Sequence, residues 1–237
     1  MDWTGIRAAL FDLDGVITPT AEIHMVAWSE LFGDFLGSRE GVAPYTDADY
    51  FAHIDGKPRY DGVRDLLASR GITLPEGEPD DDPGAETVCG LGNRKDQAFT
   101  EILARDGVRA YPGTLALLDD LDRRGVASAV VSSSKNARAV LDAAGLGRRF
   151  GVIVDGNVAR EERLRGKPAP DTYLRAAELL GVPREQCVVV EDAVSGVQAG
   201  RAGGFGFVLG VDRGAGADTL ERAGAHLVVS DLEEARP

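Results

Sequence analysis

Two aspartates, separated by a single residue, stand at the end of an apolar segment. Asp12 and Asp14 follow the run of residues 6–11 and are themselves followed by Gly15. Residues two apart in an extended segment point to the same side, so both carboxylates are expected to face one pocket. Gly15 allows a tight bend directly after them. Two aspartates at this spacing also occur by chance, so the pair indicates chemistry only if further polar groups meet it.

Three further segments bring polar groups to comparable places. A serine-rich stretch follows the apolar run 126–131, an acidic pair follows the run 187–190, and a lysine precedes an expected helix. Because ligands bind beyond the carboxyl ends of parallel strands, we expect these groups to converge. The residues concerned are Ser132, Ser134, Lys135, Asn136, Lys167, Glu191 and Asp192.

Four carboxylates in one pocket would repel one another strongly unless a cation lay among them. Oxygen ligands suit a hard divalent ion, and Mg²⁺ accepts a few carboxylates together with a substrate phosphate. Lys167 and Ser132 then suit the remaining phosphate oxygens. Helix N-termini expected after Ser134 and Ala193 would add backbone N–H donors for an anion. The combined pattern predicts a magnesium-dependent phosphate site.

The elements that must position these groups alternate between strand and helix. Six short runs are apolar throughout, which is typical of strands with both sheet faces covered. Amphipathic segments between them end at glycine, the common residue after a helix. We therefore expect an α/β fold with a doubly wound parallel sheet. The expected strands are residues 6–11, 126–131, 150–154, 187–190, 205–211 and 226–229, and the expected helices are 114–124, 136–144, 171–180, 195–202 and 217–223.

Residues 21–105 interrupt this alternation with helical patterns and no strand-like run. Helices are expected at 21–36, 61–70 and 95–105, and the acidic run 78–83 is expected to be a solvated loop. We therefore predict a core domain formed by residues 1–20 and 106–237, with a helical domain at 21–105 inserted after the first strand.

The bulk properties bound the function. The 237 residues carry a net charge of −13, which argues against a nucleic-acid or anionic membrane surface. The two cysteines have no zinc-ribbon spacing, and no apolar run is long enough to span a bilayer. We expect a monomeric cytoplasmic protein with a small-molecule substrate and no nucleic-acid or membrane partner.

The order of the motifs resembles the haloacid dehalogenase (HAD) superfamily of phosphotransferases. The matching motifs are the "DLDG" of Asp12 and Asp14, the strand-ending Ser132, Lys167 in "GKPAPD", and "EDA" at Glu191 and Asp192. The resemblance covers nearly the whole chain, and "DLDGVIT" with "SSSKN" at 132–136 extends it to the β-phosphoglucomutase-like family.

The resemblance implies a role for each matching residue. Asp12 would be the nucleophile that becomes an aspartyl phosphate, and Asp14 the general acid and base. Ser132 and Lys167 would hold the transferring phosphoryl group. The Mg²⁺ ligands would be Asp12, the backbone carbonyl of Asp14, Asp192 and, directly or through water, Glu191.

A mutase needs a second anion site for the phosphate that is not transferred, whereas a phosphatase does not. Ser134, Lys135 and Asn136 open a helix with a hydroxyl, a cation and an amide. In the segment from Gly56, Arg59 resembles the arginine that grips the distal phosphate in this family. Lys95, expected to open the last inserted helix, resembles a sugar-contacting residue, with a solvated helix-end charge as the alternative.

His24 lies ten residues after Asp14 on the first inserted helix. A histidine at the edge of the core is the simpler interpretation. The resemblance instead implies that the inserted helical domain is a cap and that His24 is a hinge residue, which couples closure of this cap to Asp14. We favour that interpretation. The sequence departs from the family at Pro19, where many relatives carry an acid, and at Asp55, where the best-known mutases carry a base.

The resemblance therefore implies an isomerase that interconverts β-glucose 1-phosphate and glucose 6-phosphate through an aspartyl phosphate and a bisphosphate intermediate. Two alternatives stay open at this point. One is a phosphatase acting on a sugar phosphate or another small phosphate ester. The other is a catalytically silent phospho-ligand binder, against which the intact nucleophile argues.

Overall fold

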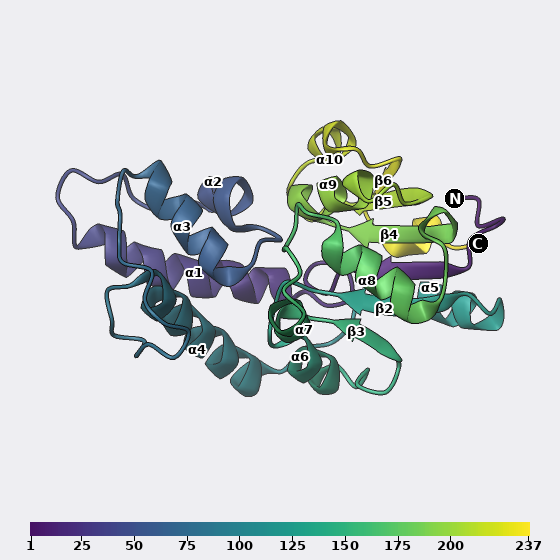
Figure 1. Ribbon diagram of the computed structural model, residues 1–237, viewed down its shortest axis with the longest axis horizontal. Coiled ribbons are helices and arrows are strands. Elements are labelled where there is room, and N and C mark those ends of the chain that lie inside the picture. The colour runs from purple at the N-terminus through teal and green to yellow at the C-terminus, as the bar shows by residue number, and fades with distance from the viewer. The chain divides into compact units, whose positions relative to one another are not determined.

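The computed structural model describes residues 1–237, which form two compact units. The larger unit contains residues 1–20 and 108–237, and the smaller unit contains residues 21–107 (Figure 1). The larger unit therefore resumes at Val108, next to the boundary at residue 106 given by the sequence pattern. Whether the smaller unit acts as a mobile cap stays a prediction.

The larger unit is built on one six-stranded parallel sheet with the order β3-β2-β1-β4-β5-β6. This order places β1 between β2 and β4 and makes the sheet doubly wound, as predicted. Every expected strand is present, with ends shifted by no more than a few residues. The strands are β1 Ala8–Phe11, β2 Ala127–Val131, β3 Val152–Val154, β4 Cys187–Glu191, β5 Phe207–Val211 and β6 Leu227–Val229.

Helices cover the sheet and bury its apolar residues. One cluster joins alternate residues of β1, β2 and β4, such as Leu10, Val131 and Val189, to apolar residues of α8, α9 and α10. Because the strands are buried on both faces, their sequences are apolar throughout and do not alternate. The helices of this unit are α5 Pro112–Arg123, α6 Ala137–Ala143, α7 Gly156–Glu161, α8 Asp171–Leu180, α9 Val194–Ala202 and α10 Ala217–Ala223, with short 3₁₀ turns η2 Arg184–Gln186 and η3 Leu232–Ala235.

The smaller unit is entirely helical and has its own apolar core. The core gathers large side chains such as Trp28, Phe32, Leu66 and Leu91. Its elements are α1 Thr20–Gly37, of which Thr20 belongs to the larger unit, α2 Asp47–Asp49, the π-helix η1 Tyr50–Ile54, α3 Arg59–Ser69 and α4 Val88–Asp106.

Several helical segments differ from the sequence-based expectation, among them α2 and η1 at 47–54, where no helix was expected. Helix α4 begins at Val88, and not at Lys95, because the Thr87 hydroxyl accepts the Gly90 N–H and caps it. Glycine is a poor helix former, so Gly90 and Gly92 hid this turn from the sequence pattern. Gly92 is needed there, since a Cβ would lie 2.7 Å from the Tyr60 ring.

Helix α7 forms at 156–161, a segment for which the sequence pattern predicts neither a strand nor a helix. The Asp155 carboxylate accepts the N–H groups of Asn157 and Val158, both at 3.0 Å, and so caps the helix. An aspartate directly after a strand is an ordinary helix-start signal.

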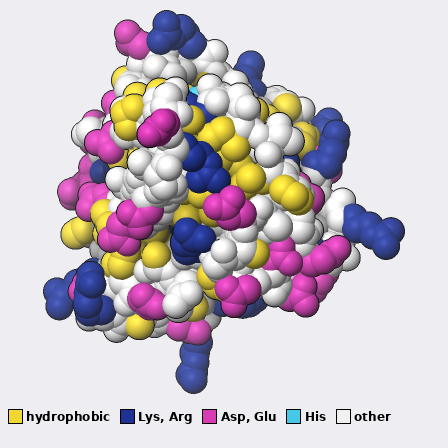
Figure 2. All heavy atoms as spheres, turned by 90° about the vertical axis from the view of Figure 1, so that its left-hand side faces the viewer, with side chains coloured by type: hydrophobic (Ala, Val, Ile, Leu, Met, Phe, Trp, Pro, Cys, Tyr) yellow, Lys and Arg dark blue, Asp and Glu magenta, His cyan; other side chains and the backbone are white.

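No helix of the structure combines the length and the apolar character needed to cross a bilayer. Figure 2 shows one face of the molecule, on which acidic and basic side chains are interspersed with hydrophobic ones.

Candidate active site

Asp12 extends β1 by one residue into the gap between its two neighbouring strands. Its N–H donates to the Val190 carbonyl at 2.9 Å, and its side chain is buried. Gly15, at φ 84°, turns the chain directly afterwards, and a Cβ there would overlap the Asp192 carboxylate. Glycine therefore lets the end of β4 bring a second carboxylate against the loop that follows β1.

Asp14 lies on this loop, and hydroxyl groups hold its side chain. Its carboxylate accepts a hydrogen bond from the Thr20 hydroxyl, which lies 2.9 Å from the Thr18 hydroxyl. Arg213 also fixes the loop, because its Nε donates to the Gly15 carbonyl at 2.9 Å. The sequence analysis did not identify these supporting residues, since only Asp14 itself belongs to a recognisable motif.

Lys167 brings the ends of three strands together. Its buried ammonium group forms ion pairs with Asp12 and, at 2.6 Å, with Glu191 Oε1. The same nitrogen donates to the Val131 carbonyl at 3.2 Å. The lysine from the loop before α8 thus joins the carboxylates after β1 and at the end of β4.

Glu191 is fully buried, and both of its carboxylate oxygens have protein partners. Besides Lys167, Oε1 accepts the Tyr173 hydroxyl at 2.7 Å, and Oε2 accepts the Ala193 N–H at 3.2 Å. A Cβ at Gly196 would overlap this carboxylate, so glycine in the first turn of α9 makes room for it. The sequence analysis missed Tyr173, which carries no motif signal.

The arrangement suits a hard divalent cation. Asp12, Glu191 and Asp192 are all buried, and each offers an oxygen within 4.8 Å of the others. Only one buried ammonium group, that of Lys167, faces these carboxylates. Oxygen ligands with a net negative charge are what Mg²⁺ prefers. The residues present therefore fit a magnesium ion, for which Asp12, Glu191 and Asp192 each offer a carboxylate oxygen.

Burial dominates the electrostatics of this cluster. Desolvation raises the pKa of Asp12 well above its ordinary value, and the neighbouring Glu191 and Asp14 add to this, while Lys167 opposes it. Burial alone would lower the pKa of Lys167, but the negative charges of Asp12 and Glu191 outweigh it and raise that pKa. A further positive charge at this place would favour the ionised nucleophile.

Ser132 follows β2, the strand on the other side of β1, and is buried. Its Oγ accepts the Ser134 N–H at 3.1 Å, and the Ser134 Oγ in turn accepts the Asn136 N–H at 3.1 Å. The Gly156 N–H of α7 donates to the Ser134 carbonyl. Helix α7 therefore supports the serine loop, in which Lys135 is exposed and Asn136 directly precedes α6.

In the smaller unit, His24 and Lys95 lie together between α1 and α4. The His24 ring stacks on Phe99 with a centroid distance of 4.1 Å, and its Nδ1 contacts the Lys95 ammonium. Lys95 is only 4% exposed, and its nitrogen lies 5.2 Å from the Trp28 ring centroid. The prediction that Lys95 opens a helix is wrong, because α4 begins seven positions earlier at Val88. The alternative of a solvated charge is also wrong, because the side chain is buried.

Arg59, the first residue of α3, belongs to a second cluster in the smaller unit. Its Nη1 lies 2.8 Å from Asp96 Oδ1, and its Nη2 donates to Asn93 Oδ1 at 3.1 Å. The Asn93 amide nitrogen donates to the carbonyls of Pro79 and Asp81, so the acidic loop 78–83 is tied to this cluster. Gly56 turns the chain before α3 with φ 69°, and Lys57 forms an ion pair with Asp65.

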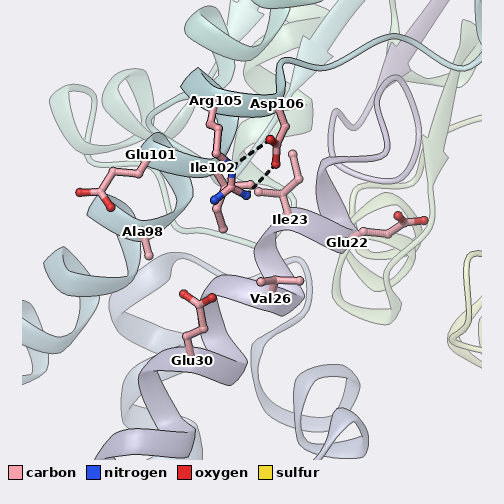
Figure 3. A pocket seen from close by; sticks show the side chains of 9 residues that line it. All are labelled: Glu22, Ile23, Val26, Glu30, Ala98, Glu101, Ile102, Arg105 and Asp106. Carbon is pink, nitrogen blue, oxygen red and sulfur yellow. Dashed lines mark hydrogen bonds and ion pairs between the residues drawn. The ribbon is translucent and has the colours of Figure 1, made fainter.

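A pocket of about 370 Å³ also lies in the smaller unit, between α1 and α4 (Figure 3). Its floor is apolar, while several carboxylates surround it, and Arg105 is paired with Asp106. None of the predicted site residues lines it. The lining residues are Glu22, Ile23, Val26, Glu30, Ala98, Glu101, Ile102, Arg105 and Asp106.

Known proteins resemble this chain in sequence and in structure. A family model described as "haloacid dehalogenase-like hydrolase" matches residues 6–204. A β-phosphoglucomutase from Mycobacterium bovis is 49% identical over 97% of this chain and 91% of its own. Hexitol phosphatase A from Escherichia coli is 35% identical over 96% and 92% of the two chains. A crystal structure of a β-phosphoglucomutase from Clostridium difficile superposes with a TM-score of 0.78 at 26% identity, covering 98% of this chain and 93% of that one.

Proposed function

Because this chain belongs to the haloacid dehalogenase-like hydrolase family, we propose that it is a magnesium-dependent phosphotransferase that interconverts β-glucose 1-phosphate and glucose 6-phosphate. The observation that carries the phosphotransferase part is the buried cluster in which Lys167 joins Asp12 to Glu191, with Asp192 alongside. The mutase part is supported by the 49% identity to the mycobacterial β-phosphoglucomutase over nearly the whole chain.

The first half-reaction transfers a phosphoryl group between the substrate and Asp12. An Asp12 carboxylate oxygen attacks phosphorus, the bond from phosphorus to the sugar oxygen breaks, and Asp14 donates a proton to that leaving oxygen. Lys167 offsets negative charge on the phosphoryl group, and the Ser132 hydroxyl donates a hydrogen bond to one of its oxygens. Asp12 and Asp192, with the Asp14 carbonyl and with Glu191 directly or through water, would hold Mg²⁺, which when bound neutralises the negative charge of the transferring group.

The second half-reaction returns the phosphoryl group to another hydroxyl. Asp14, now ionised, accepts the proton of the attacking sugar hydroxyl while the bond from phosphorus to Asp12 breaks. Starting from phosphorylated Asp12 and β-glucose 1-phosphate, this yields a bisphosphate. The phosphoryl group at carbon 1 of that bisphosphate then passes to Asp12, which releases glucose 6-phosphate and restores the phosphorylated enzyme.

The remaining predicted site residues of both units have proposed roles in this cycle. Arg59, together with Ser134, Lys135 and Asn136, would bind the phosphate that is not being transferred. Lys95 would contact the sugar. Gly56, in the turn before Arg59, would let the substrate approach the backbone closely. His24 would couple movement of the smaller unit to Asp14, and its contact with the buried Lys95 supports a shared role for the two.

A phosphatase is the second candidate, and two observations favour it. Arg59 is already paired with Asp96 and Asn93, so a phosphate would have to share or displace these partners. Hexitol phosphatase A is also 35% identical over most of the chain. In that case water takes the place of the second sugar hydroxyl, and inorganic phosphate leaves.

The test is a panel of sugar phosphates supplied with Mg²⁺ and a trace of β-glucose 1,6-bisphosphate. Glucose 6-phosphate and inorganic phosphate are measured in parallel. We expect glucose 6-phosphate from β-glucose 1-phosphate, with a rate that depends on the bisphosphate. Steady phosphate release without any need for the bisphosphate would instead identify a phosphatase. A silent binder would turn over nothing, and Asp12→Asn would then change no phosphate chemistry.

A further inference from the structure

Tyr173 of α8 is a fully buried residue for which the proposed mechanism has no use. Its hydroxyl donates to Glu191 Oε1 at 2.7 Å, and its ring lies 5.1 Å from the Lys167 ammonium. Packing of the ring requires no hydroxyl, since the ring meets Phe205 edge-on inside the apolar core. A buried hydroxyl aimed at the carboxylate that holds the lysine therefore calls for a reason beyond packing.

Glu191 Oε1 is shared between two donors. Besides the Tyr173 hydroxyl it meets the Lys167 ammonium at 2.6 Å, and the same ammonium is paired with Asp12. A hydrogen bond to a carboxylate withdraws negative charge from the oxygen that accepts it. The Tyr173 hydroxyl therefore weakens the attraction of Glu191 for Lys167, and a larger part of the lysine's charge is left for Asp12.

We propose that Tyr173 is a positioning residue. Its hydrogen bond to Glu191 Oε1 weakens the ion pair between Glu191 and Lys167, so that the Lys167 ammonium group stays close to Asp12. This inference rests on the proposed phosphotransferase function and adds a residue to it. The side chain does not touch the reacting atoms. It acts through Glu191, whose other oxygen is fixed by the Ala193 N–H, so that the carboxylate stays in place while Lys167 serves the nucleophile.

Removing the hydroxyl should shift Lys167 toward Glu191 and away from Asp12. The transferring phosphoryl group would then lose part of its neutralising charge, which slows the chemical step. At the same time the negative charge of Asp12 would be less neutralised by Lys167 than in the wild type, so the free enzyme should bind Mg²⁺ more tightly. These two effects have opposite directions, and a loss of packing alone would not produce that combination.

The experiment compares Tyr173→Phe with the wild type and with Tyr45→Phe. Tyr45 is a suitable control because its hydroxyl is buried, has no hydrogen-bond partner and belongs to the smaller unit. Hydrolysis of a small aryl phosphate gives kcat and KM, and titration calorimetry with Mg²⁺ alone gives the Kd of the substrate-free protein. For Tyr173→Phe we expect kcat to fall about tenfold with little change in KM, and the Kd for Mg²⁺ to fall roughly threefold. Tyr45→Phe should change neither.

The result that would overturn the inference is a Tyr173→Phe protein whose kcat and Mg²⁺ affinity both match those of Tyr45→Phe. A weaker Mg²⁺ affinity accompanied by a lower melting temperature would also overturn it, because that pattern indicates a packing role. Failure of the proposed function is a separate outcome. The wild type would then turn over no phosphate ester, while the Mg²⁺ titration of Tyr173→Phe would still decide the position of Lys167.

Discussion

The predicted site residues of the larger unit meet at one end of a sheet, whereas those of the smaller unit fall into two clusters. Asp12, Glu191 and Asp192 come within a few ångströms of one another because parallel strands end side by side. In the smaller unit, His24 is joined to Lys95, while Arg59 is joined to Asp96. A parallel sheet thus dictates which residues meet, but a helical unit leaves this to details of packing.

The difference also concerns how charge is balanced. In the larger unit a single buried ammonium group faces several carboxylates, which leaves the cluster negative and suited to a cation. In the smaller unit Arg59 is matched by Asp96, and Lys95 lies against aromatic rings. We therefore expect the larger unit to catalyse phosphoryl transfer and the smaller unit to determine which substrate is accepted.

The largest effect should follow from removing the nucleophile in the larger unit. Asp12→Asn keeps the shape of the side chain but cannot form the aspartyl phosphate. We expect phosphoryl transfer to fall by a factor on the order of 10³ or more with every substrate, measured as product formation under saturating Mg²⁺. Wild-type turnover by this variant would show that the chemistry does not take place at the carboxylate cluster of the larger unit.

Lys167→Met should be nearly as damaging and should also destabilise the fold. The change leaves Asp12 and Glu191 buried without their common cation, which costs about 3–5 kcal/mol. Urea denaturation measures the free energy of unfolding, and Mg²⁺ should restore part of it because the metal binds the same carboxylates in the folded state. If Mg²⁺ stabilises the wild type but gives the variant no additional benefit, metal and lysine do not share these ligands.

Arg59→Ala should affect mutase turnover but not the hydrolysis of a substrate that has only one phosphate. If Arg59 binds the phosphate that is not transferred, the variant loses mutase turnover by a factor on the order of 10². Hydrolysis of a small aryl phosphate, which has no second phosphate, should stay within about twofold of the wild type. Asp96→Ala, which removes the carboxylate partner of Arg59, is the matched control for disruption of the α3–α4 contact. Equal losses on both substrates would contradict a distal-phosphate role.

Lys95→Met should have the smallest effect on the free energy of unfolding. Stability and turnover are expected to respond differently to this change. Methionine can fill the space between Trp28 and Phe99 without a buried charge, so the free energy of unfolding should be unchanged or higher by about 1 kcal/mol. Turnover of the sugar phosphate should nevertheless fall, because the ammonium group beside His24 is lost. A variant that is less stable yet fully active would identify Lys95 as a structural residue.

Much of the larger unit could be predicted from sequence because its signals are local and its topology is regular. Asp12 and Glu191 follow apolar runs whose strand character is unambiguous, and a parallel sheet then brings them together. Tyr173 could not be found in this way. Its role depends on which face of α8 meets the sheet and on a 2.7 Å contact, and neither carries a sequence signal.

The smaller unit was predicted less well, for reasons that are equally physical. Gly90 and Gly92 weaken the helical pattern, although Gly92 is required for α4 to lie against Tyr60. The helix start was therefore placed too late, and Lys95 was given an end position that it does not occupy. The contact between Arg59 and Asp96 joins residues far apart in sequence, and no sequence motif predicts it.

The whole proposed mechanism depends on one divalent ion, bound beside the nucleophile by carboxylates at the ends of β1 and β4. Anomalous scattering from crystals grown with Mn²⁺ in place of Mg²⁺ tests this directly, since it locates the metal without reference to activity. We expect one strong peak within bonding distance of both Asp12 and Asp192. A peak at another place, or none at saturating Mn²⁺, would contradict it.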